Sequence, residues 1–116
     1  MSKVVKKLES GVIHTKVYRD GSLWYEKYEL NGDYHREDGP AFIEYNRDGS
    51  IHWESYWSND ERHREDGPAW INYHRDGSLR KESYYLNNKA YNKKDYEAWQ
   101  QDKEADEIID KMLASV

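Results

Sequence analysis

The chain has no cysteine among its 116 residues, which excludes disulfides, thiolate nucleophiles and cysteine-based zinc sites. It also has no apolar run of membrane-spanning length. The first residues, MSKVVKKLESG, contain lysines but lack the apolar stretch of a secretory signal peptide. These absences predict an intracellular protein, and we expect it in the cytoplasm.

Positive charge is also scarce. Lysine and arginine number 18 against 23 aspartates and glutamates, which leaves a formal net charge of −5. Nucleic acids and anionic membranes attract strongly basic surfaces, so we expect no direct binding to either. The chain is nevertheless 15% aromatic, with 11 tyrosines and 5 tryptophans. Disordered chains are poor in aromatics, so we expect one folded domain over residues 1–116 with a modest core.

The sequence repeats with a period of 28 residues. RDGS occurs at 19–22, 47–50 and 75–78, and HREDGPA occurs at 35–41 and 63–69. At this period the chain divides into three units, 11–38, 39–66 and 67–94. The recurring columns are Glu26, Glu54 and Glu82; Tyr28, Tyr56 and Tyr84; Asn31, Asn59 and Asn87; Leu23, Ile51 and Leu79; and Thr15, Ile43 and Ile71.

Each unit has the pattern of a β-hairpin. Residues 41–46 and 51–57 alternate in the way that half-buried strands do, and both are rich in β-branched and aromatic residues. The Asp-Gly of RDGS is a strong hairpin signal, and an asparagine-led pair marks the opposite bend. We therefore predict a mainly β fold in which three hairpin repeats over 11–90 form an antiparallel meander of roughly six strands.

The last segment changes character. Residues 92–115 lack glycine and proline and predict a helix near 93–114, with Asn92 as N-cap and Asp95 in the first turn. An apolar stripe at helical spacing is expected from Tyr96, Trp99, Ile109, Met112 and Leu113. Two roles stay open for this helix. It either closes the end of the array, which we favour, or stands free to bind a partner.

The HREDGPA string has two interpretations. His35 with Glu37 and Asp38 could form a general base and its orienting carboxylate, or bind a metal. We favour a structural turn, because neighbouring side chains on one loop rarely converge and the string occurs twice. In that interpretation Gly39 supplies a positive-φ hinge, and Pro40 starts the next strand. The arginines of the two strings are expected to pair with acids of the neighbouring unit. No catalytic, cofactor-binding or metal-binding residue is assigned.

Two sets of side chains are candidates for contact with a partner. The glutamate column either forms an acidic stripe or pairs with Arg19, Arg47 and Arg75, which repeat in register; pairing is favoured. Tryptophans that a thin sheet cannot fully bury are common interface anchors. The predicted partner-binding residues are Trp24, Glu26, Trp53, Glu54, Trp57, Trp70, Glu82, Asp102, Glu104 and Asp106.

These repeated units resemble the divergent MORN-like repeats of small bacterial and phage proteins, including antitoxin-like proteins of the YwqK type. The resemblance rests on the Asp-Gly-Ser, Glu-x-Tyr, Asn-Gly and His-Arg-Glu-Asp-Gly-Pro-Ala elements and covers about residues 11–90. It implies successive antiparallel hairpins that scaffold protein–protein contacts, and it carries no catalytic residue. The 28-residue period is longer than that of better-known MORN repeats, and the acidic charge argues against lipid binding.

The first functional hypothesis is a non-enzymatic binding protein, such as a small phage or mobile-element inhibitor of a host defence protein of the anti-CRISPR kind. It would act in the host cytoplasm by covering a partner's surface, for example that of a nucleic-acid-binding defence complex. The second is an antitoxin or immunity partner of a cognate toxin. The third is a ligand-binding or metal-binding protein, or a hydrolase, that uses the two histidine loops. A homodimer formed through an exposed edge strand is also credible.

Overall fold

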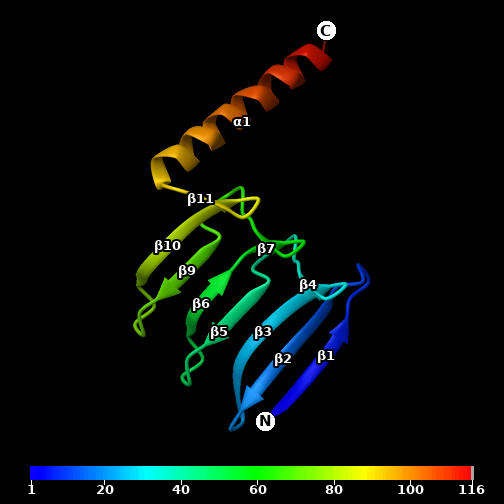
Figure 1. Ribbon diagram of the computed structural model, residues 1–116, viewed down its shortest axis with the longest axis vertical. Helices are drawn as coiled ribbons and strands as arrows, with labels where there is room; N and C mark the ends of the chain where they lie inside the picture. The colour runs from blue at the N-terminus through cyan, green and yellow to red at the C-terminus, as the bar shows by residue number, and fades with distance from the viewer. Residues whose placement is uncertain (116) are drawn as a thin grey trace.

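The computed structural model describes residues 1–115 and shows one long sheet with a helix projecting beyond its last strand (Figure 1). The molecule measures 59 × 34 × 22 Å. The strands are β1 (Ser2–Lys7), β2 (Ile13–Arg19), β3 (Ser22–Leu30), β4 (Asp33–Tyr34), β5 (Phe42–Tyr45), β6 (Ile51–Ser55), β7 (Trp57–Ser58), β8 (Glu61–Arg62), β9 (Trp70–Tyr73), β10 (Leu79–Leu86) and β11 (Lys89–Tyr91), and the helix is α1 (Lys93–Ala114).

The sheet is an antiparallel meander. Its order is β1-β2-β3-β5-β6-β9-β10-β11; β4 pairs with the end of β3, and β7 and β8 form a separate two-stranded ladder. The hairpins β2–β3, β5–β6 and β9–β10 come from successive 28-residue units, which confirms the predicted fold class. Strand β1 was not predicted. It pairs with β2 over six residues, and its exposed edge carries lysines that discourage further pairing.

The turns follow the residues that tolerate positive φ. Asn31, Asn59 and Asn87 have φ of 52°, 49° and 48°, and each is followed by a second residue with positive φ. Two consecutive residues of this kind make the tight turn that matches the twist of a hairpin. The sequence prediction for these bends is confirmed.

The core is a narrow strip that repeats along the sheet. The β-branched column Thr15, Ile43 and Ile71 is buried, and Ala41 and Ala69 have no exposed surface. The peptide N–H of Ala41 donates to Ser55 O (2.9 Å), and that of Ala69 donates to Ser83 O (2.9 Å). Ala41 also packs in a buried cluster with Val12 and Tyr28, so a larger side chain there would have to displace packed neighbours.

Helix α1 begins as predicted. The side-chain oxygen of Asn92 accepts a hydrogen bond from the Asp95 amide at 2.8 Å, as an N-cap does. In the first turn Tyr96 is only 1% exposed and packs on Tyr84 with ring centroids 4.8 Å apart. Its hydroxyl accepts from the Gly67 N–H (3.2 Å) and donates to the Arg64 carbonyl.

The single apolar stripe predicted for this helix is wrong. Tyr96 and the half-buried Trp99 face the sheet end, whereas Ile109, Met112 and Leu113 are 52%, 65% and 69% exposed. The helix has 22 residues and is longer than the end surface of the sheet, so only its first turns can pack there. The first turns therefore close the array, and the rest of α1 extends away from it (Figure 1).

Replacing Tyr96 with phenylalanine tests the docking of the helix. We expect Tyr96→Phe to lower the free energy of unfolding by about 1 kcal/mol, because the change removes two hydrogen bonds of a buried hydroxyl. Urea unfolding followed by tryptophan fluorescence measures the change. The matched control is Tyr91→Phe. The Tyr91 side chain makes no hydrogen bond within residues 1–115, so this variant should unfold with nearly the wild-type free energy. Equal losses in the two variants would contradict the assigned docking.

Candidate protein-binding surfaces

The predicted tryptophans lie half-buried in cross-strand packing. Trp53 stacks on Phe42 with centroids 4.7 Å apart, and the indole N–H of Trp57 donates to Ser55 Oγ at 2.7 Å. Trp70 is also half-buried, in β9. These side chains help to hold the sheet while keeping part of their surface accessible.

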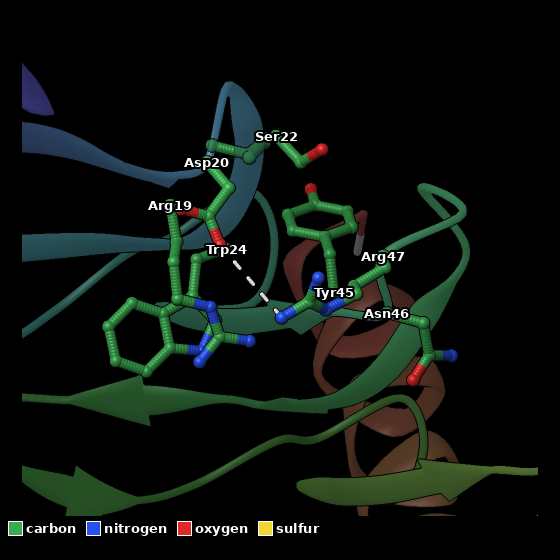
Figure 2. Close-up of a pocket in the computed structure, with 8 residues that line it drawn as sticks. Arg19, Asp20, Ser22, Trp24, Tyr45, Asn46 and Arg47 are labelled. Carbon is green, nitrogen blue, oxygen red and sulfur yellow. Dashed lines mark ion pairs between the residues drawn. The ribbon is translucent and has the colours of Figure 1, made fainter. Parts of the chain in front are cut away.

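Trp24 borders a small pocket of about 180 Å³ at the RDGS end of the hairpins (Figure 2). The Arg19 guanidinium covers the Trp24 ring at 4.4 Å from its centroid. Across the pocket Arg47 forms an exposed ion pair with Asp20 at 3.9 Å. Because both partners are exposed, this ion pair contributes little to stability. The pocket is a small polar surface.

The glutamate column does not pair with the arginine column. Glu54 accepts a hydrogen bond from the hydroxyl of Tyr73 (2.9 Å). In the preceding unit Glu26 accepts one from Tyr45, which is the repeat equivalent of Tyr73. Glu82 has no further unit beside it and accepts from Tyr84 at 3.0 Å. The expected arginine ladder is wrong because a tyrosine of the next hairpin reaches each of the first two glutamates.

These bonds also affect the pKa values of Glu26 and Tyr73. Burial alone would raise the pKa of Glu26, but hydrogen bonds from Tyr45 and His14 outweigh it and hold that pKa below its usual range. Burial, together with the bond to Glu54, raises the pKa of Tyr73 to about 12. The carboxylates are therefore engaged inside the sheet, and the acidic surface open to a partner lies elsewhere.

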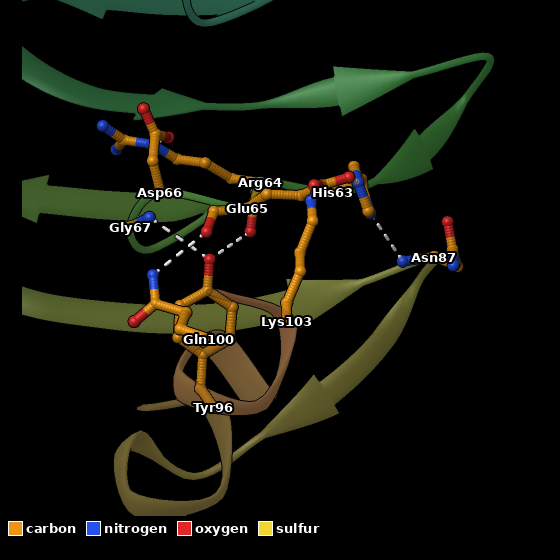
Figure 3. Close-up of polar contacts among 9 residues, drawn as sticks. All are labelled: His63, Arg64, Glu65, Asp66, Gly67, Asn87, Tyr96, Gln100 and Lys103. Atoms are coloured by element: carbon orange, nitrogen blue, oxygen red, sulfur yellow. Dashed lines mark hydrogen bonds and ion pairs between the residues drawn. The ribbon is translucent and has the colours of Figure 1, made fainter. Parts of the chain in front are cut away.

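Two loops carry the HREDGPA string, and we call residues 35–41 loop 1 and residues 63–69 loop 2. In loop 1 the Nδ1 of His35 accepts a hydrogen bond from the Asn59 amide at 3.1 Å. In loop 2 the Nδ1 of His63 accepts from the Asn87 amide at 2.9 Å (Figure 3). Each histidine thus holds the asparagine turn of the next unit, and its Nδ1 is not free to act as a base.

The arginine of each loop folds back on its own loop. Arg36 Nε donates to Asp38 Oδ1 (3.0 Å), Nη1 donates to Pro40 O (3.1 Å), and the guanidinium lies 4.0 Å from the centroid of Tyr28. Arg64 repeats these contacts in loop 2. The predicted pairing of the arginines with a neighbouring unit is therefore wrong. The bond from Arg36 holds the pKa of Asp38 below its ordinary value.

Gly39 and Gly67 serve these arginines and are not positive-φ hinges, as had been expected. A Cβ on Gly39 would lie 2.8 Å from Arg36 Cζ, and one on Gly67 would lie 2.9 Å from Arg64 Cζ. Glycine is needed because the guanidinium approaches the backbone closely. The histidine, arginine, aspartate and glycine of the string therefore make contacts that hold the loops, which agrees with a turn, but the positive-φ hinge and the arginine pairing expected for that turn are wrong.

The acids predicted on the helix, Asp102, Glu104 and Asp106, are all exposed. The same part of the helix carries an exposed apolar surface, and this exposure was not predicted from the sequence. We call it the distal stripe; its members are Ile108, Ile109, Met112 and Leu113. At 3.6 residues per turn the distal stripe lies roughly 160° around the helix from the docked side chains Tyr96, Trp99, Gln100 and Lys103. It therefore cannot fold onto the sheet while the first turns stay docked.

No protein-family model matches the chain, and no curated protein or solved structure matches it. The likeness to MORN-like repeats thus remains an expectation from the sequence. Over residues 1–115 there is no group of three or more histidines, aspartates or glutamates arranged to hold a metal ion. Among the residues that the structure describes, no helix is long and apolar enough to cross a membrane.

The histidine contact is tested by His63→Ala. We expect a loss of about 1 kcal/mol in the free energy of unfolding, because the amide of Asn87 loses its intramolecular acceptor. Denaturant unfolding measures the change, and His74→Ala is the matched control because its side chain is exposed. A loss as large in the control would show that His63 has no special role in joining the units.

The role of Gly39 is tested by a double-mutant cycle with Arg36. Gly39→Ala should cost about 1–2 kcal/mol in the wild-type chain, because the new methyl displaces the guanidinium from its partners. In the Arg36→Ala background the same change should cost much less, since nothing remains to be displaced. Equal costs in both backgrounds, measured by denaturant unfolding, would show that the glycine is needed for another reason.

Proposed function

We propose that the protein is a non-enzymatic protein-binding module that covers a surface of its partner. The hairpin sheet is the rigid scaffold, and the distal part of α1 is the contacting element. The observation that carries this proposal is the distal stripe, in which four large apolar side chains are 52–69% exposed on a helix that is anchored elsewhere. Exposed apolar surface of this kind, rimmed by charge, is typical of interaction sites.

The charges beside the distal stripe indicate the chemistry of the partner. Asp106 borders one side of the stripe and Glu104 the other, whereas Asp102 lies in line with the stripe and nearer the sheet. An amphipathic helix with this arrangement fits an apolar groove with a basic rim. Basic grooves are the surfaces with which proteins bind nucleic acids, so the proposal extends to an inhibitor that occupies such a groove on a defence protein.

The test is partner capture followed by affinity measurement. Tagged protein is used to isolate a stoichiometric partner from bacterial lysate, which mass spectrometry identifies. We expect Ile109→Glu with Met112→Glu to weaken binding of that partner at least about a hundredfold, because two carboxylates would enter an apolar groove.

The control places two glutamates on the other side of the helix and changes the net charge by −3 instead of −2, so any general effect of charge would be larger in the control. Lys111→Glu with Ala114→Glu should leave affinity within a few-fold of wild type. Equal weakening by both pairs would show that the distal stripe is not the contact. Isolation of a bound metal or small molecule without a protein partner would overturn the proposal and favour the histidine loops as a site.

A further inference from the structure

Helix α1 is held on loop 2 by contacts that a partner could reproduce on loop 1. The Tyr96 hydroxyl bonds to the Arg64 carbonyl and the Gly67 amide. One turn later Gln100 Nε2 donates to the Glu65 carbonyl at 3.0 Å (Figure 3). After a further turn Lys103 forms an ion pair with the Glu65 carboxylate. Three side chains at positions i, i+4 and i+7 of a helix therefore recognise loop 2.

The 28-residue repeat gives loop 1 the matching residues, although the place that Tyr96 takes over Tyr84 is held at Tyr56 by the Arg64 guanidinium. Arg36, Glu37 and Gly39 correspond to Arg64, Glu65 and Gly67, and Tyr56 corresponds to the Tyr84 on which Tyr96 packs. All four line a groove of about 590 Å³ between loop 1 and loop 2. We call it the inter-loop groove.

The glutamate of loop 1 is exposed in the inter-loop groove, whereas helix α1 partly covers the matching glutamate of loop 2. The Glu37 side chain is 90% exposed, compared with 46% for Glu65. Within residues 1–115 no side chain hydrogen bonds to the Gly39 amide or to the Arg36 and Glu37 carbonyls, the three backbone groups that match the contacts of α1.

One difference determines how an occupant would enter. Loop 2 forms the far wall of the inter-loop groove, and the Arg64 guanidinium lies 4.0 Å from the Tyr56 centroid, where Tyr96 covers Tyr84 in the occupied site. An entering aromatic ring would therefore lie against a guanidinium, which favours the electron-rich face of tyrosine.

We propose that the inter-loop groove is a second docking site, which binds a partner helix presenting a tyrosine and a lysine seven residues apart. The tyrosine hydroxyl bonds to the Gly39 amide and the Arg36 carbonyl, and the ammonium pairs with Glu37. This inference rests on the proposed function only in taking the occupant to be a protein. It uses loop 1, whereas the proposed function is carried by the distal stripe.

The probe is a synthetic peptide of residues 92–115, because α1 already shows the required pattern. It is titrated into the full-length isotope-labelled chain, in which the chain's own helix covers loop 2. We expect saturable shifts of the Gly39 and Glu37 amide resonances, with the Gly67 amide unchanged. In the peptide, the Tyr96→Phe change should weaken these shifts severalfold.

Glu37→Lys in the full-length chain should weaken binding about tenfold, since it replaces an attraction by a repulsion. Glu107→Lys is the matched control, an equal charge change at an exposed residue far along α1, and should bind as wild type does. Absence of shifts at Gly39 up to millimolar peptide would overturn the proposal. Shifts at Gly67 and Trp99 instead would also overturn it, because the peptide would then replace the chain's own helix. Neither result bears on the distal stripe, which is tested separately.

Discussion

The contact on which this architecture depends is the hydrogen bond that each loop histidine accepts from the asparagine turn of the next unit. A single-layer sheet has no second layer to hold its hairpins in register, and an isolated hairpin is marginally stable in water. His35 and His63 add a side-chain connection to the β3–β5 and β6–β9 ladders, because each accepts a hydrogen bond from the amide of an asparagine 24 residues further on. The arginine and glycine of each loop then hold that histidine in place, since the guanidinium clamps the loop backbone to the strand tyrosine. A string that resembles a catalytic motif is thus used to join repeats.

The end of the array follows from the same repeat. A third loop would place an arginine over Tyr84, as Arg36 and Arg64 lie over Tyr28 and Tyr56. Asn92 occupies that sequence position and caps the helix instead. Tyr96 then packs on Tyr84 in place of the missing guanidinium and reaches back to loop 2. The helix is therefore anchored by the surface that another repeat would have covered, and terminal repeats of such arrays commonly need a cap of this kind.

Local signals predicted most of the fold, and tertiary contacts account for what they missed. The hairpins were predictable because Asp-Gly and asparagine-led pairs favour tight turns whatever surrounds them. Strand β1 was missed because Ser2–Lys7 shows no alternation and depends on pairing with β2. The need for Gly39 could not be read from its own neighbours, since it arises from the folding back of Arg36. The distal stripe was assigned to the core because helical spacing alone does not tell how much surface the array offers for it to cover.

The repeat itself indicates where a binding function can reside. Residues that recur between units are engaged with one another, as the pairs Glu54–Tyr73 and Arg64–Tyr56 show. The two proposed interaction surfaces lie outside these internal contacts. The distal stripe belongs to the non-repeating helix, and the inter-loop groove lies between loop 1 and loop 2, where the Glu37 side chain is 90% exposed. Specificity for a partner can therefore change at these two places while the hydrogen bonds that join the hairpins stay intact.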